Sequence, residues 1–221
     1  MRDLYYIARI MRSDNGLRVM LIVLYSIGVY RFFQSGADYR IFMGMFRIMD
    51  DSFAESLSAN LFSIMYMVAG VAVPLGCFSK FLMIPDCFVY VRSSRTVARL
   101  ARGLFLLCAY CCVYSGVQLA IAACIMPARD CGTLLVTAVC STWMLGMLHL
   151  ICNLGYLCGN AAMGVCAAAT AYGGLLSLRG VMRWLLSNGL FGLPVWVGLF
   201  FLVTMALFIA NYCAFMRMEI L

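Results

Sequence analysis

The stretch "RTVARLARGLFLLCAYCCVYSGVQLAIAACIM", residues 95–126, decides the fold class of this chain. The residues after Arg102 carry no charge up to the end of the stretch, and about 20 consecutive apolar residues let a helix cross a bilayer. Arg92, Arg95, Arg99 and Arg102 follow one another at spacings of three, four and three. On a helix such spacings place side chains on one face. The sequence therefore predicts a transmembrane helix that begins with a positively charged stripe.

The composition of the whole chain supports the same class. Apolar residues make up 65% of the 221 residues and charged residues only 11%, whereas soluble domains have roughly 45–50% and 25%. The chain is therefore predicted to be an integral membrane protein. We relate its net charge of +7 to membrane orientation and anionic lipid, and we expect no nucleic-acid partner.

Runs of apolar residues predict an all-α fold with six transmembrane helices in a single domain, residues 1–221. The predicted spans are 17–33, 57–79, 103–126, 132–154, 157–177 and 193–216. The first span is the weakest, because it lies between Arg18 and Arg31. It crosses the bilayer only if both arginine side chains extend to opposite interfaces, and otherwise the chain has five spans.

The distribution of basic residues predicts the orientation of these spans. With the N-terminus inside, cytoplasmic segments hold ten of the sixteen basic residues. These are Arg2, Arg9, Arg12, Arg18, Lys80, Arg92, Arg95, Arg99, Arg102 and Arg217. The positive-inside rule then places both termini in the cytoplasm of a multi-pass plasma-membrane protein.

Two segments outside the predicted spans are amphipathic. The N-terminal residues combine tyrosine and isoleucine with arginine, and we interpret them as a cytoplasmic lead-in at the headgroup layer. Between the first two spans, Phe42, Met43 and Phe46 belong to an apolar face at helical spacing. We expect an external helix here, which either closes the loop or forms an extracytoplasmic gate.

Twelve cysteines raise the question of a metal site or disulfides. Most of them lie in apolar spans, where a thiol serves as a small hydrophobic group. Cys108, Cys111 and Cys112 form the only compact group but lack a convincing fourth ligand, so we expect no metal site. Cys124 and Cys131 flank a short external loop, and whether they form a disulfide stays open.

The motifs argue against catalysis by this chain alone. His149 and Asn153 share a helix face, as in glutamate-dependent intramembrane proteases, but those enzymes need a glutamate pair and a second histidine. His149 is the only histidine, so we interpret it as a hydrogen-bonded helix contact. Without a G-x-x-x-x-G-K-[ST] loop, the chain is expected to bind no cofactor, and ATP and Mg would bind to a separate subunit.

The order of the segments resembles a known family of transporters. Two spans are followed by the basic segment "KFLMIPDCFVYVRSSRTVARLARG", residues 80–103, and then by four spans and the tail "CAFMRMEIL". This layout resembles the small permease subunits of ABC-2-type exporters, most closely those of bacteriocin or lantibiotic export and immunity systems. The likeness covers essentially the whole chain and lies in its layout, since no single motif is diagnostic.

The resemblance implies partners and a coupling site. Such a permease pairs with an identical or related permease and with two cytoplasmic ABC ATPase subunits, and it moves a peptide or amphipathic cargo. The family's coupling helix, which reaches the ATPase, falls here on Pro85, Asp86, Arg92, Arg95 and Arg99. Arg102, nearest the bilayer, is expected to anchor the helix to anionic lipid.

Two other functions are compatible with the sequence. A substrate-binding S-component of an energy-coupling-factor importer has the same number of spans, and "AAMGVCAAATAYGG", residues 161–174, suits close packing against a partner helix. The other alternative is a non-transporting immunity or partner protein in the membrane. Copurification of an ATPase subunit separates the permease from the non-transporting protein.

Overall fold

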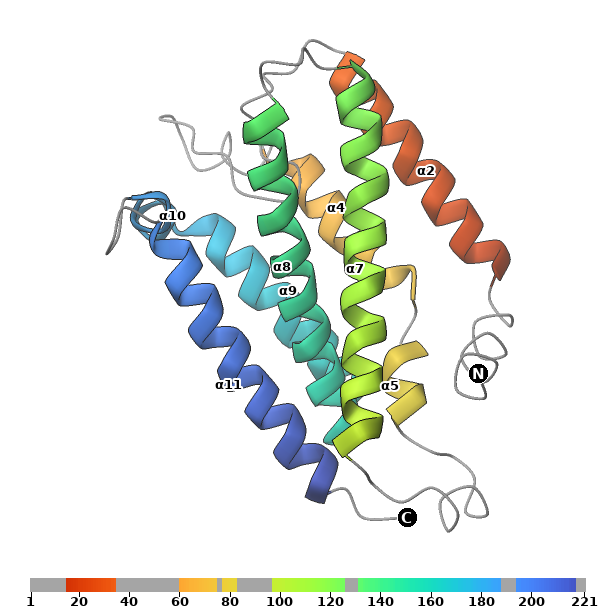
Figure 1. The fold of residues 1–221 in the computed structure, drawn as a ribbon, viewed down its shortest axis with the longest axis vertical. Coiled ribbons are helices and arrows are strands. Elements are labelled where there is room, and N and C mark those ends of the chain that lie inside the picture. Colours follow the sequence, from red (N-terminus) through yellow and green to blue (C-terminus); the bar gives the residue numbers. More distant parts are fainter. Residues whose placement is uncertain are drawn as a thin grey trace.

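The computed structural model describes residues 15–34, 60–74, 77–82, 97–125, 131–187 and 194–217 as helices joined by turns. The helices are α2 (Asn15–Gln34), α4 (Leu61–Ala72), α5 (Cys77–Leu82), α7 (Val97–Ile125), α8 (Cys131–Leu157), α9 (Ala161–Ser177), α10 (Arg179–Leu186) and α11 (Val195–Arg217). The predicted all-α class is thereby confirmed for this part of the chain. Figure 1 shows a bundle in which α7 begins and α11 ends at the same end.

Three of the described helices, α7, α8 and α11, are long and apolar enough to cross a membrane. They have 29, 27 and 23 residues. At a rise of 1.5 Å per residue they measure about 35 to 44 Å, which exceeds the roughly 30 Å of a hydrocarbon core. These helices identify the chain as a membrane protein. The apolar parts of α2, α4 and α9 are shorter.

The second predicted span, 57–79, is divided in the structure. Its described part forms α4, a turn, and then α5. The division falls at Pro74, which has no N–H to donate to the preceding helical turn. The backbone N–H of Val73 still donates to the carbonyl of Ala69, at 2.9 Å, and the N–H of Cys77 donates to the carbonyl of Pro74, at 2.8 Å. A broken helix therefore replaces the continuous span that the apolar run predicts.

Helix α8 lies at the centre of the bundle. It packs against α4, α5, α7, α9 and α11, and Figure 1 shows it between α7 and α11. Cys140 and Leu145, both on α8, are completely buried. Residues along much of its length belong to the main apolar core together with residues of α4, α7, α9 and α11. The other long helices are thus held through their contacts with α8.

A tight reversal joins α8 to α9 within "CNLGYLCGN", residues 152–160. It follows Leu157 and so lies slightly later than the predicted spans 132–154 and 157–177 imply. Gly159 has a φ of 83°, which is the left-handed conformation that glycine adopts most readily. Its N–H donates to the carbonyl of Tyr156, and the N–H of Asn160 donates to the carbonyl of Gly155. This pair of bonds is a Schellman motif, which ends α8. The Asn160 side chain then accepts from the N–H of Met163 and caps α9.

Two glycines bring α8 and α9 into backbone contact. A Cβ atom placed on Gly155 would lie 2.4 Å from the Cα atom of Gly164, and one placed on Gly164 would lie 2.7 Å from the carbonyl oxygen of Cys152. No larger residue fits without moving one helix. The small-residue stretch 161–174 therefore packs against α8 of the same chain at this point.

Arg18, near the start of α2, is buried rather than extended toward an interface. Its side chain is 5% exposed, and Nη2 donates to the Sγ atom of Cys77 on α5, at 2.9 Å. A span over residues 17–33 would require this side chain to extend to a membrane interface. The contact with α5 replaces that arrangement at this end of α2.

We expect Gly164→Ala to destabilise the protein by about 1–3 kcal/mol, because the added methyl group overlaps the backbone of α8. Gly174→Ala is the matched control on α9, since a Cβ atom there meets nothing within 4 Å. That control should leave stability unchanged or raise it slightly, because alanine favours the helix. Unfolding by SDS in mixed micelles measures both variants, and equal stabilities would contradict the close approach.

Candidate functional site

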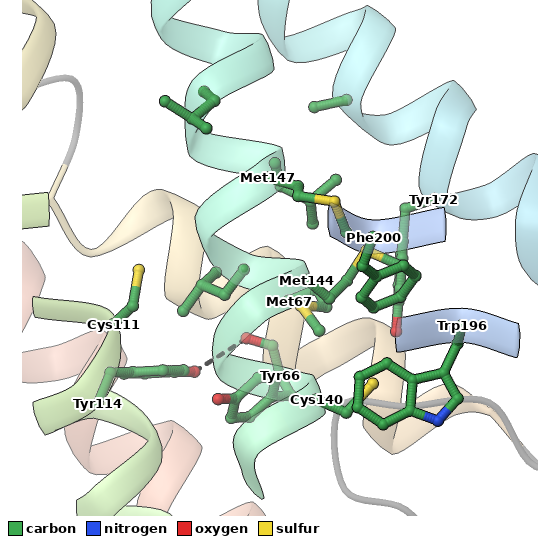
Figure 2. Packing of buried hydrophobic residues seen from close by; sticks show 14 of the residues in the cluster. Tyr66, Met67, Cys111, Tyr114, Cys140, Met144, Met147, Tyr172, Trp196 and Phe200 are labelled. Atoms are coloured by element: carbon green, nitrogen blue, oxygen red, sulfur yellow. Dashed lines mark hydrogen bonds between the residues drawn. The ribbon is translucent and has the colours of Figure 1, made fainter. Parts of the chain in front are cut away.

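Four tyrosines form a stacked cluster between α2, α4 and α7. The ring centroids of Tyr66 and Tyr114 are 4.9 Å apart, and those of Tyr25 and Tyr114 are 5.3 Å apart. Tyr110 stacks on Tyr114 at 6.0 Å. The Tyr114 hydroxyl donates to the backbone carbonyl of Tyr66 at 2.9 Å, as the dashed line in Figure 2 shows. The Tyr66 hydroxyl forms a further hydrogen bond with that of Ser115 on α7. The cluster thus joins α4 to α7 through rings and hydroxyls, and it joins α2 to both through the ring of Tyr25.

The carbonyl of Gly70 is the acceptor that links α4 to α7 and α8. In a continuous helix this carbonyl would accept from the residue four positions later, but that residue is Pro74, which has no N–H. Instead, the Tyr110 hydroxyl donates to it at 2.7 Å, and Nε2 of His149 lies 3.2 Å from it. A carbonyl only accepts, so Nε2 carries the proton. The interpretation of His149 as a hydrogen-bonded helix contact is confirmed.

A pair of asparagines links α8 to α11. Nδ2 of Asn211 donates to the carbonyls of Leu150 and Leu207, at 3.0 and 2.8 Å. These two acceptors determine the orientation of the Asn211 amide, whose Oδ1 accepts from Nδ2 of Asn153 at 2.7 Å. Oδ1 of Asn153 is buried and has no hydrogen-bond partner within the described part of the chain. The network therefore leaves one acceptor unsatisfied.

A pocket with a volume of about 440 Å³ lies beside these residues. Small-molecule sites typically measure about 300–1,000 Å³. Residues of α4, α5, α7, α8 and α9 line the pocket, and most of them are apolar. Its polar lining consists of His149, Asn153, Tyr156 and Tyr172. His149 and Asn153 lie one turn apart on α8, so the predicted shared face is confirmed and borders this pocket.

Tyr172 contributes a second polar atom without a partner. It belongs to the buried core that also includes Phe200 and Trp196 (Figure 2). Its hydroxyl has no hydrogen-bond partner among the residues that the structure describes. Buried polar groups without partners are rare in proteins and call for an explanation.

A second cavity, of about 610 Å³, lies between α7, α8 and α11. The hydroxyls of its lining residues have partners within the protein: Thr142 donates to the carbonyl of Ala138, and Thr204 accepts from Nε1 of Trp143 at 2.8 Å. This cavity presents an apolar surface without an unsatisfied buried side-chain atom among the described lining residues. The pocket beside His149 and Asn153 is therefore the candidate site.

The structure locates two of the predicted coupling and anchor residues. Arg99 is half-buried and Arg102 is exposed, both in the first turns of α7. Nε of Arg102 donates to the carbonyl of Ala98 at 3.2 Å. The other predicted residues lie outside the described ranges. These are Pro85, Asp86, Arg92 and Arg95 of the coupling segment, and Phe42, Met43 and Phe46 of the external helix. The N-terminal lead-in lies outside them as well.

The cysteines of the described ranges form no metal site. Within those ranges no three His, Cys, Asp or Glu side chains lie close enough together to hold a metal ion. Cys111 is buried in the core, and Cys124 is a free thiol. The side chain of Cys131 lies outside the description.

Several residues of the site did not stand out in the sequence. The sequence pattern does not point to Tyr110, Tyr172 or Asn211 as site residues, and it predicts no convergent polar set. One signal was available, since a polar residue inside an apolar span, such as Asn211, is expected to hydrogen-bond another helix. The glycine four residues before Pro74 is a second signal, because its carbonyl needs a new donor.

A double-mutant cycle tests the shared acceptor. Tyr110→Phe and His149→Leu each remove one donor to the Gly70 carbonyl, and each should cost about 0.5–1.5 kcal/mol. The double variant should lose about 1–3 kcal/mol more than the sum, because the buried carbonyl then has no donor. Unfolding by SDS in mixed micelles measures the free energies.

Tyr114→Phe combined with His149→Leu is the control for this cycle. Tyr114 donates to the carbonyl of Tyr66 and not to that of Gly70, so the two losses should add. If Tyr110→Phe and His149→Leu also add, the Gly70 carbonyl is not their common acceptor.

Comparison with known proteins gives no relative for this arrangement. No known protein family, curated protein or solved structure matches the chain. The functional assignment therefore depends on the geometry of the helices and the pocket.

Proposed function

We propose that this chain is the six-span transmembrane permease subunit of an ATP-driven exporter whose ATPase subunits are separate proteins. The observation that carries the proposal is a small buried cluster at one end of the bundle. It consists of Leu82, Leu100, Leu157 and Phe215, which come from the ends of α5, α8 and α11 and from the start of α7. The end of α5 and the start of α7 therefore lie beside the C-terminal end of α11.

The same cluster supports a six-span topology with both termini on one side. Helices α7, α8, α9 and α11 alternate in direction (Figure 1), and α2 begins near α5 through the contact of Arg18 with Cys77. Helices α4 and α5 together would make the second span as a broken helix. Membranes tolerate such a break where protein surrounds it, and the Gly70 carbonyl is satisfied by Tyr110 and His149.

The charges support a cytoplasmic assignment for this end. Arg99 and Arg102 on α7 and Arg217 in the last turn of α11 lie there, and basic residues favour the cytoplasmic side. The coupling segment would then face the cytoplasm, where Arg92, Arg95 and Arg99 can pair with carboxylates of an ATPase. Arg102 would bind anionic lipid. ATP and Mg would bind to the ATPase subunits, and a second permease would complete the pathway.

The position of the pocket favours an exporter over an importer of the S-component type. Asn153 and Tyr156 lie next to Leu157, which belongs to the cluster at the proposed cytoplasmic end. An importer would present its binding site toward the outside. A pocket close to the ATPase end suits a cargo that is taken from the cytoplasm or from the inner leaflet.

Substituted-cysteine labelling tests the topology on a cysteine-depleted background. A cysteine at Ser93 should be protected from a membrane-impermeant maleimide in intact cells, and a cysteine at Gly36 should react, because the two positions lie on opposite sides. Permeabilised cells provide the control for reactivity. External labelling at Ser93 or protection at Gly36 would reject the orientation.

Charge reversal tests the coupling assignment. Arg92→Glu or Arg95→Glu should reduce copurification of the ATPase by about 10- to 150-fold, since a charge-assisted bond contributes about 1.5–3 kcal/mol. Arg102→Glu should instead impair insertion or lipid binding while the inserted fraction still binds the ATPase. If all three variants bind the ATPase and transport like the unmodified protein, the arginines act only as an anchor.

A further inference from the structure

The pocket between α4, α7, α8 and α9 combines an apolar wall with a single polar edge. We propose that it binds a small amphipathic molecule, whose apolar body fills the cavity and whose hydroxyl or amide N–H lies at the edge formed by His149 and Asn153. The assignment of this pocket as the exporter's cargo site rests on the permease role proposed above. Binding itself needs neither the ATPase nor the proposed orientation.

Oδ1 of Asn153 is a hydrogen-bond acceptor without a donor in the described structure. The Asn153 side chain is 6% exposed, and its Nδ2 is held by Oδ1 of Asn211. The amide cannot rotate by half a turn to use its oxygen there, because Asn211 already directs an oxygen at it. Oδ1 of Asn153 thus stays an acceptor without a donor in the described structure. A ligand with a donor removes this unfavourable state.

His149, the neighbouring polar residue, offers a second acceptor. Nε2 of His149 is committed as a donor to the Gly70 carbonyl, so Nδ1 of the neutral ring is an acceptor. His149 and Asn153 both line the pocket, one helical turn apart. His149 and Asn153 therefore offer two acceptors, and the hydroxyls of Tyr156 and Tyr172, which also line the pocket, can donate or accept. The described lining residues include no Lys or Arg, so the chemistry favours a donor head group over a carboxylate or phosphate.

The rest of the pocket lining is apolar, and the pocket opens to the surface of the bundle. Phe78, Leu107 and Ala168 lie among the apolar residues that line the cavity. Two other lining residues, Val68 on α4 and Val165 on α9, are 61% and 52% exposed. The pocket therefore reaches the outer surface of the bundle between α4 and α9. In a membrane that surface faces lipid, so an amphipathic molecule can enter from the bilayer.

Photolabelling with a diazirine-bearing octanol tests the site in the full-length protein, reconstituted into phosphatidylcholine nanodiscs. The probe has an apolar chain and one hydroxyl donor. Mass spectrometry should locate saturable labelling on peptides of α8 and α9 that line the pocket, and unlabelled octanol should compete. A diazirine-bearing octane without the hydroxyl should label these peptides about tenfold less, because it cannot satisfy Asn153.

A matched pair of variants on α9 shows whether the cavity itself is responsible. Ala169 lines the pocket and Ala171 does not, and both are exposed on the same helix. Ala169→Leu should lower octanol labelling by about tenfold or more, since the added side chain occupies the cavity. Ala171→Leu should label like the unmodified protein.

Several outcomes would overturn the proposal. Labelling that does not saturate indicates ordinary contact with dissolved probe. Equal labelling of the Ala169→Leu and Ala171→Leu variants places the probe elsewhere, and equal labelling by octanol and octane indicates a merely lipid-filled cavity. Failure of ATPase copurification would reject the permease role but leave this binding result unaffected.

Discussion

The Gly70 carbonyl is the point on which the arrangement of the central helices depends. Pro74 removes its donor within α4, and burial in a membrane protein leaves no water to replace that donor. Tyr110 from α7 and His149 from α8 supply hydrogen bonds instead. One carbonyl is therefore a point at which α4, α7 and α8 meet.

Helix α8 is also held to its neighbours by specific contacts along its length. Inside a bilayer the hydrophobic effect does not drive helices together, so close packing and hydrogen bonds must do so. Gly155 allows α9 to approach to backbone contact. Asn153 and Trp143 donate hydrogen bonds to Asn211 and Thr204 on α11. Because different positions on α8 serve different neighbours, the helix acts as the common partner of the bundle.

The candidate pocket follows from these contacts. His149 and Asn153 both line it. Each uses one polar atom to hold a neighbouring helix, and each has a second polar atom that the helix contact does not use. Groups held rigidly by a second bond are well positioned for a ligand. The structural bonds and the candidate recognition site thus share the same side chains.

The sequence by itself determined the membrane class, the all-α fold, and the approximate limits of the helices, because apolar runs and charge depletion are local properties of the chain. It also predicted a reversal between the spans 132–154 and 157–177, which the structure places slightly later, at Gly159 and Asn160, and the contact role of His149. Only the tertiary structure decided that the apolar run 57–79 forms two helices, α4 and α5, in its described part, that Arg18 lies buried against Cys77, and that Asn153 retains an unsatisfied oxygen beside a pocket. Such features depend on which side chains from distant segments meet, and hydrophobicity does not specify those partners where lipid is as apolar as the side chains.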